Sequence, residues 1–188
     1  MGKTVHLEEV PYSPDSCELF ERIRDLPGAA LLDSSFPHSR SGRWDILTAQ
    51  PSGALPALPQ EADEATYRRF FEELGRFHRE RYAGIQPAAD IPFCGGILGC
   101  LPYDWGNPLN RVAVPSAWSA NDVGPPPLAA YDWCLVQDHL LGRAVLASLP
   151  SVPADKRRDL QARFRRQGLD HTTPIQLSRP MNSNLSEA

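Results

Sequence analysis

The stretch LAAYDWCLVQDHLLGRAVLASL, residues 128–149, decides the fold of this 188-residue chain. Its first half, 128–138, is a run of apolar and aromatic residues that predicts a strand. The sequence HLLG at 139–142 ends in glycine and predicts a turn, after which 143–149 returns as the antiparallel partner. The stretch therefore predicts a β-hairpin, and the other elements can be placed around it.

Four more segments have the composition of strands. Residues 3–11 partly alternate apolar and polar side chains, which fits a strand with one buried face. The short apolar runs GAALLDS at 28–34 and RWDILTA at 43–49 lie on either side of a loop rich in serine, proline and glycine. Residues 92–106 hold three glycines in five positions, which predicts a strand that bends or lets another backbone approach closely.

Three segments predict helices. Ser13 can cap the first, Pro14 suits its first turn, and apolar residues recur at helical spacing up to Leu26. The segment 64–82 places its aromatic residues mainly on one face. The third, 156–166, has six cations around a narrow apolar stripe and predicts a solvated surface helix. Together the elements predict an α+β domain of two packed, mostly antiparallel β-sheets, a β-sandwich, with flanking helices.

Length and composition exclude several classes of protein. The chain and its 41% hydrophobic content fit one domain. No apolar run approaches the roughly 18 residues of a membrane helix, and the amino terminus has no secretory pattern, so a cytoplasmic protein without membrane contact is expected. A formal charge of -4 gives no electrostatic reason to bind nucleic acid. The four cysteines lack CxxC spacing, and three of them sit inside apolar segments, which predicts buried thiols rather than metal ligands or disulfides.

The common enzyme motifs are missing from the sequence. GGILG at 95–99 is neither GxGxxG nor a P-loop, and HExxH, GxSxG and SxxK do not occur. Asp132 and Asp138 flank a predicted strand and are expected as exposed carboxylates rather than as an acid and base pair. A hydrolase that uses Ser34 or Ser35 as nucleophile with His38 as base is a further alternative, although closeness in sequence is a poor guide to a catalytic triad.

Polar residues gather on both sides of the loop between the strands predicted at 28–34 and 43–49. An amino-acid ligand needs a carboxylate for its ammonium group, a cation or backbone N–H for its carboxylate, and an apolar wall. A hairpin would bring such groups together, and the simpler alternative is an acid and arginine pair that only satisfies a turn. The candidate residues are Asp33, Ser34, Ser41, Gly42, Arg43 and Trp44.

Three spaced blocks also carry a family resemblance. LPGAALLDSSFPHSRSGRWDILTAQP (26–51) has a leucine pair, a serine two positions later, a loop, and then Arg-aromatic-Asp. IPFCGGILGCLPYDWG (91–106) is a Pro-Phe-x-Gly-Gly block that ends in Tyr-Asp, and YDWCLVQDH (131–139) is a Tyr-Asp-Trp strand. These blocks resemble the amino-terminal region of component I of aminodeoxychorismate synthase, which is related to anthranilate synthase component I. MNSNLSEA (181–188) looks like the stretch where the catalytic domain of that family begins.

The resemblance implies a domain organisation and a parent reaction. Residues 1–170 would form a non-catalytic β-sandwich domain, and 171–188 a linker to a chorismate-binding catalytic domain that is absent here. The parent enzyme would convert chorismate and ammonia, delivered by a glutamine amidotransferase subunit (component II), to 4-amino-4-deoxychorismate for folate and 4-aminobenzoate synthesis. Magnesium would bind only the absent domain, so no catalytic residue, metal or cofactor is expected in this chain.

The resemblance further implies an L-tryptophan site, which serves feedback inhibition in anthranilate synthases and holds a structural ligand in some aminodeoxychorismate synthases. Asp33 stands where feedback-regulated relatives have glutamate, and Asn107 where the family often has arginine. The PFCGG, YDWG and YDWCLV blocks look more like the folate enzyme. The alternatives are an anthranilate synthase domain and a free-standing protein-interaction module. The positions that match the family's tryptophan site are Ser34, Ser41, Gly42, Arg43 and Trp44.

Overall fold

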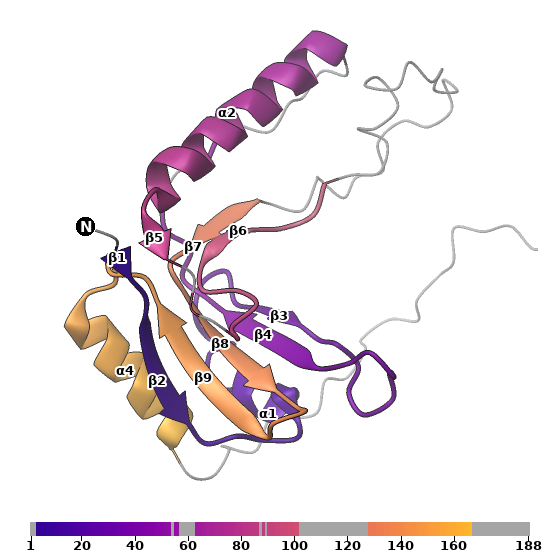
Figure 1. Cartoon of the computed structure of the whole chain (residues 1–188), viewed down its shortest axis with the longest axis vertical. Helices are drawn as coiled ribbons and strands as arrows, with labels where there is room; N and C mark the ends of the chain where they lie inside the picture. The colour runs from indigo at the N-terminus through magenta and orange to yellow at the C-terminus, as the bar shows by residue number, and fades with distance from the viewer. Residues whose placement is uncertain are drawn as a thin grey trace, which may run out of the picture.

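A five-stranded antiparallel sheet in the order β2-β9-β8-β4-β3 forms the centre of the computed structural model (Figure 1). The structure describes residues 3–53, 55–56, 63–86, 88, 90–101 and 128–166. The hairpin predicted from 128–149 supplies β8 and β9, which lie in the interior of this sheet. Its strands are β2 (His6–Val10), β3 (Ala30–Leu32), β4 (Trp44–Thr48), β8 (Trp133–Asp138) and β9 (Arg143–Ser148).

Both faces of β8 are buried. Successive side chains of a strand point to opposite faces of its sheet. Trp133 and Leu135 accordingly join one core cluster, and Cys134 and Val136 join a second cluster on the other side. This explains why the strand reads as a continuous apolar run rather than as an alternating one.

Two helices cover the first face of the sheet. They are α1 (Ser16–Phe20) and α4 (Ala154–Arg165), and Figure 1 shows α4 lying along β2. The buried residues Leu160 and Phe164 of α4 form the apolar stripe expected from the sequence, and Phe164 meets the indole of Trp133 edge-on with ring centroids 6.3 Å apart.

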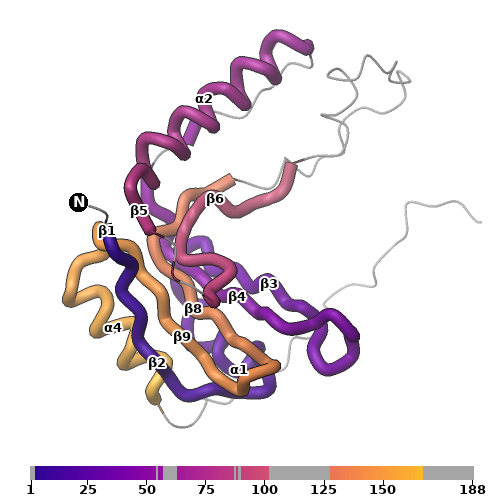
Figure 2. Tube along the Cα trace, viewed as in Figure 1, coloured from indigo at the N-terminus to yellow at the C-terminus, as the bar shows by residue number. Residues whose placement is uncertain are grey.

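The segment that follows α2 (Glu64–Tyr82) covers the second face. Ile85, Ile91 and Phe93 pack there against Cys134 and Val136, and Figure 2 shows the trace between β5 and β6 running down over the large sheet. Two small sheets flank this segment, since β1 (Lys3–Thr4) pairs in parallel with β5 (Ile85–Gln86), and β6 (Gly96–Leu98) pairs antiparallel with β7 (Ala129–Tyr131). The structure confirms the α+β class and the mostly antiparallel pairing, whereas the sandwich packing stays a prediction.

The structure divides the strand predicted at 128–138 into two. Asp132 separates β7 from β8, because β7 pairs with β6 while β8 belongs to the large sheet. At this break the Asp132 carbonyl accepts a hydrogen bond of 2.8 Å from the N–H of Leu149. The continuous apolar run could not reveal a change of sheet.

The first helix is shorter than predicted. It begins at Ser16, and Asp15 rather than Ser13 caps it by accepting a hydrogen bond from the N–H of Cys17. After Phe20 the N–H groups of Arg22 and Ile23 bond to carbonyls three residues back, so the chain continues as tight turns. By contrast, α2 has the bounds predicted for it and is capped by the carboxylate of Asp63.

The cysteine prediction was right in part. Cys94 and Cys134 are buried free thiols, while Cys17 and Cys100 are free but exposed, so two cysteines are buried where three were expected. No helix in the described ranges combines the length and the apolar character that crossing a membrane requires. The proposed linker at 171–188, the stretch 181–188, and Asn107 lie outside the described residues.

The core of the large sheet can be tested with two leucines. Leu160→Ala should lower the free energy of unfolding by about 2 to 5 kcal/mol, because truncating a buried leucine leaves a cavity. Leu160 is 1% exposed, whereas Leu140 is 71% exposed. In urea unfolding followed by circular dichroism, the matched variant Leu140→Ala should change stability by less than about 0.5 kcal/mol. Equal losses in the two variants would contradict the described core.

Candidate functional site

The predicted site residues lie at one end of the β3–β4 hairpin. The register pairs Leu32 with Ile46, so the loop 33–43 connects the two strands. A Cβ atom built on Gly42 would stand 2.8 Å from the carbonyl oxygen of Ser34 and 3.3 Å from its Oγ. Glycine is therefore needed at this position for the close approach of two chain segments. The structure confirms that the hairpin brings the end of β3 and the start of β4 together.

Ser34 has a satisfied backbone and an unsatisfied side chain. Its N–H donates a hydrogen bond of 2.7 Å to Oδ1 of Asp45. Its Oγ is buried and has no hydrogen-bond partner among the described residues. A buried hydroxyl without a partner is costly, by about 1 to 3 kcal/mol, and native structures usually give such a group a water or a ligand. This hydroxyl is also not bonded to His38, so the Ser34 and His38 pair of the hydrolase alternative is not formed.

Arg43 is held by an acid that the sequence did not suggest. Its Nε and Nη2 donate to the two carboxylate oxygens of Asp138 at 3.0 and 2.9 Å, and the guanidinium lies 4.2 Å from the ring centroid of Trp44. The hydrogen bonds with Asp138 raise the pKa of Arg43, and those from Arg43 lower the pKa of Asp138. The Asp138 side chain is 1% exposed, so its prediction as an exposed strand-end carboxylate is wrong. The β4–β8 register places it opposite Trp44.

Asp33 and Ser41 lie at the surface of the same loop. The Oδ1 atom of Asp33 accepts a hydrogen bond of 2.6 Å from the N–H of Ser35, and Ser41 contacts the hydroxyl of Ser39. The structure thus joins Ser34 to Gly42 and stacks Arg43 on Trp44, but both Asp33 and Ser41 are exposed. The acid that pairs with Arg43 is Asp138 and not Asp33, so the simple turn pair considered from the sequence is also not formed.

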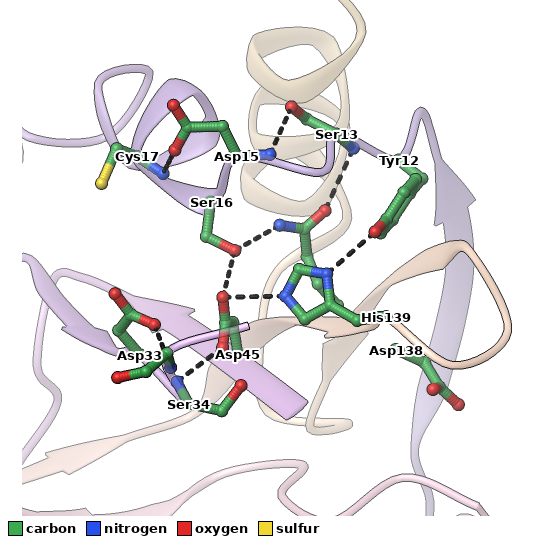
Figure 3. Close-up of polar contacts among 12 residues, drawn as sticks. Tyr12, Ser13, Asp15, Ser16, Cys17, Asp33, Ser34, Asp45, Asp138 and His139 are labelled. Atoms are coloured by element: carbon green, nitrogen blue, oxygen red, sulfur yellow. Dashed lines mark hydrogen bonds and ion pairs between the residues drawn. The ribbon is translucent and has the colours of Figure 1, made fainter. Parts of the chain in front are cut away.

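Beneath this loop lies a buried carboxylate, Asp45, whose side chain is 4% exposed (Figure 3). Its Oδ2 accepts hydrogen bonds from Oγ of Ser16 at 2.5 Å and pairs with Nε2 of His139 at 2.9 Å, while Oδ1 accepts from Ser34. Burial raises the pKa of Asp45, but the hydrogen bonds from Ser16, Ser34 and His139 outweigh burial, and the net pKa is lowered. The ionised carboxylate is therefore the stable form near neutral pH.

The contacts of Asp45 extend into a larger polar network. The hydroxyl of Tyr12 lies 2.8 Å from Nδ1 of His139, and the ring of Phe36 stacks on the same imidazole with centroids 4.4 Å apart. Gln137 donates from Nε2 to Oγ of Ser16 and accepts from the N–H of Ser13. The network joins the start of α1, the loop 33–43, β4 and the end of β8, as Figure 3 shows.

Sequence reasoning missed Asp45, His139 and Tyr12. One signal was available for Asp45, because it lies on the same face of β4 as Leu47, which is a core position, while Trp44 and Ile46 lie on the other face. An acid at a core position of a strand needs buried donors. Nothing in the local sequence of Tyr12 or His139 identifies them as partners, since they come from distant parts of the chain.

The described residues define an α+β domain that carries a polar network under a hairpin end. No three His, Cys, Asp or Glu side chains within the described ranges are grouped so that they could hold a metal ion. No protein-family model matches the chain. The chain is 31% identical to aminodeoxychorismate synthase component 1 of Salmonella typhimurium across 196 aligned residues, which cover 94% of this chain and 39% of that protein.

Two further relatives have the same name. The Klebsiella aerogenes protein is 31% identical over 69% of this chain and 30% of its own length, and the Escherichia coli protein is 31% identical over 64% and 28%. The chain is therefore a relative of aminodeoxychorismate synthase component 1 and corresponds to the amino-terminal part of these proteins, which confirms the family resemblance. It spans about two-fifths of the length of the Salmonella relative, or 39%.

The contact between Ser34 and Gly42 can be tested by adding one methyl group. Gly42→Ala should destabilise the fold by about 1 to 3 kcal/mol, because the new Cβ meets a backbone oxygen that cannot move without the hairpin. Gly75→Ala is the matched control, since its Cβ on α2 would meet only the flexible end of Arg79. Thermal unfolding should show this control stabilised by about 0.5 to 1 kcal/mol. A neutral Gly42→Ala variant would rule out the tight approach.

The charge of Asp45 predicts a pH dependence of stability. Its folded pKa lies below the ordinary value of 3.8, so its contribution is fully present above that value and is lost as the pH falls through the folded pKa. Asp45→Asn should cost about 1 to 3 kcal/mol near neutral pH, because the amide cannot accept from all three donors. Urea titrations should show this difference shrinking below about pH 4. The exposed control Asp33→Asn should cost little stability, and a deficit in Asp45→Asn that does not change with pH would contradict an ionised Asp45.

Proposed function

We propose that this chain is a non-catalytic regulatory or scaffold domain of a chorismate-using synthase and that it binds L-tryptophan at the end of the β3–β4 hairpin. The similarity to component 1 proteins supports the kind of parent enzyme. The buried hydroxyl of Ser34 is the observation that carries the ligand site, because no described residue forms a hydrogen bond of good geometry with it.

Other residues of the same hairpin end suit the parts of an amino acid. A guanidinium has five N–H donors, and Asp138 uses two of those on Arg43, which leaves donors for a ligand carboxylate. Trp44 offers an aromatic surface for an indole. Gly42 lies beside Ser34, but its N–H and that of Ser41 already bond to Ser39, so the ligand carboxylate depends on Arg43. The exposed carboxylate of Asp33 is the candidate partner for the ligand ammonium.

The proposal for the parent enzyme follows from the name of its relatives. Together with a glutamine amidotransferase subunit, component II, it would form 4-amino-4-deoxychorismate in the cytoplasm on the route to folate. Chorismate, the catalytic residues and magnesium would bind in a separate chorismate-binding domain, against which this domain would pack. The printed names favour this branch over an anthranilate synthase.

A second candidate function is that of a protein-interaction module. Leu140 and Leu141 are 71% and 58% exposed, and Phe36 stacks on the histidine that precedes them. These three side chains offer an apolar surface to another protein. A pull-down that captures component II through this surface, combined with no response to tryptophan, would favour this candidate.

L-Tryptophan should raise the thermal midpoint of the purified chain and release or absorb heat on titration. A ligand that binds only the folded state stabilises it by about 2.7 kcal/mol at a concentration 100 times its Kd. Ser34→Ala should weaken binding by about tenfold, because one hydrogen bond is lost. The control Ser151→Ala, an exposed serine, should bind as the unsubstituted chain does. Tryptamine, which lacks the carboxylate, should bind more weakly if Arg43 contacts that group.

The outcomes separate the two parts of the proposal. No response to millimolar L-tryptophan by either method would overturn the ligand site. Formation of 4-amino-4-deoxychorismate from chorismate and ammonia by the purified chain would instead overturn its non-catalytic role.

A further inference from the structure

The imidazole of His139 is a buried titratable group that the proposed ligand site does not use directly. Its side chain is 1% exposed. Nδ1 faces the hydroxyl of Tyr12 at 2.8 Å, and Nε2 faces Oδ2 of Asp45 at 2.9 Å. Both ring nitrogens are therefore satisfied, by residues that lie 127 and 94 positions away in the chain.

A donor and an acceptor can be assigned to each hydrogen bond of the His139 ring without conflict. An ionised carboxylate only accepts, so Nε2 of His139 carries the proton and donates to Asp45. In a neutral imidazole the other nitrogen then accepts, and the hydroxyl of Tyr12 donates to Nδ1. Burial, followed by the charges of Asp45 and Asp138, raises the pKa of Tyr12, which keeps its phenol protonated and able to donate.

His139 is linked to the loop 33–43 at three places, once through Asp45 and twice directly. At the start of the loop, Asp45 links it to the N–H of Ser34, with a distance of 2.7 Å between the amide nitrogen and Oδ1. Within the loop, Phe36 stacks on its ring at an interplanar angle of 5°. At the end of the loop, its own backbone N–H donates to the carbonyl of Arg43 at 2.9 Å. A single residue therefore touches the segments that carry Ser34 and Arg43.

We propose that His139 is a positioning residue that holds Ser34 and Arg43 in the geometry that an amino-acid ligand requires, with Tyr12 fixing the orientation of its ring. This inference rests on the proposed function of the loop as an L-tryptophan site. Neither His139 nor Tyr12 needs to touch the ligand. The residue acts through Asp45, the stacked Phe36 and the hydrogen bond to Arg43.

The test compares two replacements of His139 in the whole chain. A glutamine places an amide N–H near the position of Nε2 and can still donate to Asp45, whereas a leucine fills space without a donor. His139→Leu should weaken L-tryptophan binding in calorimetry by about tenfold, and His139→Gln should restore it to within about threefold of the unsubstituted chain. His6→Leu, at an exposed histidine of β2, is the matched control and should leave binding unchanged.

A spectroscopic measurement keeps the test decisive if His139→Leu does not fold. Tyr12→Phe removes only a hydroxyl from a half-buried ring and should preserve the fold. In this variant the imidazole nitrogen resonances of His139 and the backbone amide resonance of Ser34 should both move, while amides of α2 should not. Tryptophan binding by Tyr12→Phe should weaken by about threefold, since the ring loses one neutral hydrogen bond.

The results distinguish this inference from the function on which it rests. If the unsubstituted chain binds tryptophan but folded His139→Leu or Tyr12→Phe binds it equally well, the positioning role is wrong and the ligand site stands. If no chain binds tryptophan, the proposed ligand is wrong. In that case the backbone amide resonance of Ser34 tests the positioning role. If this resonance does not move in Tyr12→Phe, the link from His139 to the loop is wrong.

Discussion

A buried carboxylate needs hydrogen bonds from the protein in place of those from water. Asp45 is such a carboxylate, and residues around the hairpin end have to supply its donors. Desolvating an ion costs several kcal/mol unless hydrogen bonds replace the lost water. Ser16, Ser34 and His139 supply those bonds from three separate elements. The start of α1, the loop after β3 and the turn after β8 must therefore come together before the charge is satisfied, which couples the candidate site to the packing of the sheet.

The two faces of β4 carry different parts of the candidate site. The side that holds Asp45 faces α1 and carries the buried network. Trp44 belongs to the cluster on the opposite side, and the guanidinium of Arg43 lies over its ring while pairing with Asp138. The start of this strand thus carries the cation and the indole, followed in sequence by the acid that fixes the N–H of Ser34. A substitution on one side of β4 is therefore expected to change the positions of residues on the other side, because the loop 33–43 connects them.

Much of the fold was predictable because it depends on local patterns. The aromatic face of α2, the stripe of α4 and the hairpin of β8 and β9 follow from the spacing of apolar residues. The errors occurred where tertiary pairing decided the outcome. A strand changed sheets at Asp132, and α1 gave way to turns after Phe20, although the side-chain pattern continues through both places.

The sequence by itself determined the α+β class, the main elements, the proximity of the groups on either side of the loop 33–43, and the resemblance to component 1 proteins. These properties are carried by runs of neighbouring residues. Only the tertiary structure decided that Arg43 pairs with Asp138, that the Ser34 hydroxyl is buried with no hydrogen-bond partner in the described part of the chain, and that His139 bonds to both Tyr12 and Asp45. The physical reason is that burial and hydrogen-bond partners are set by sheet register and by contacts between residues up to 127 positions apart, which no local pattern records.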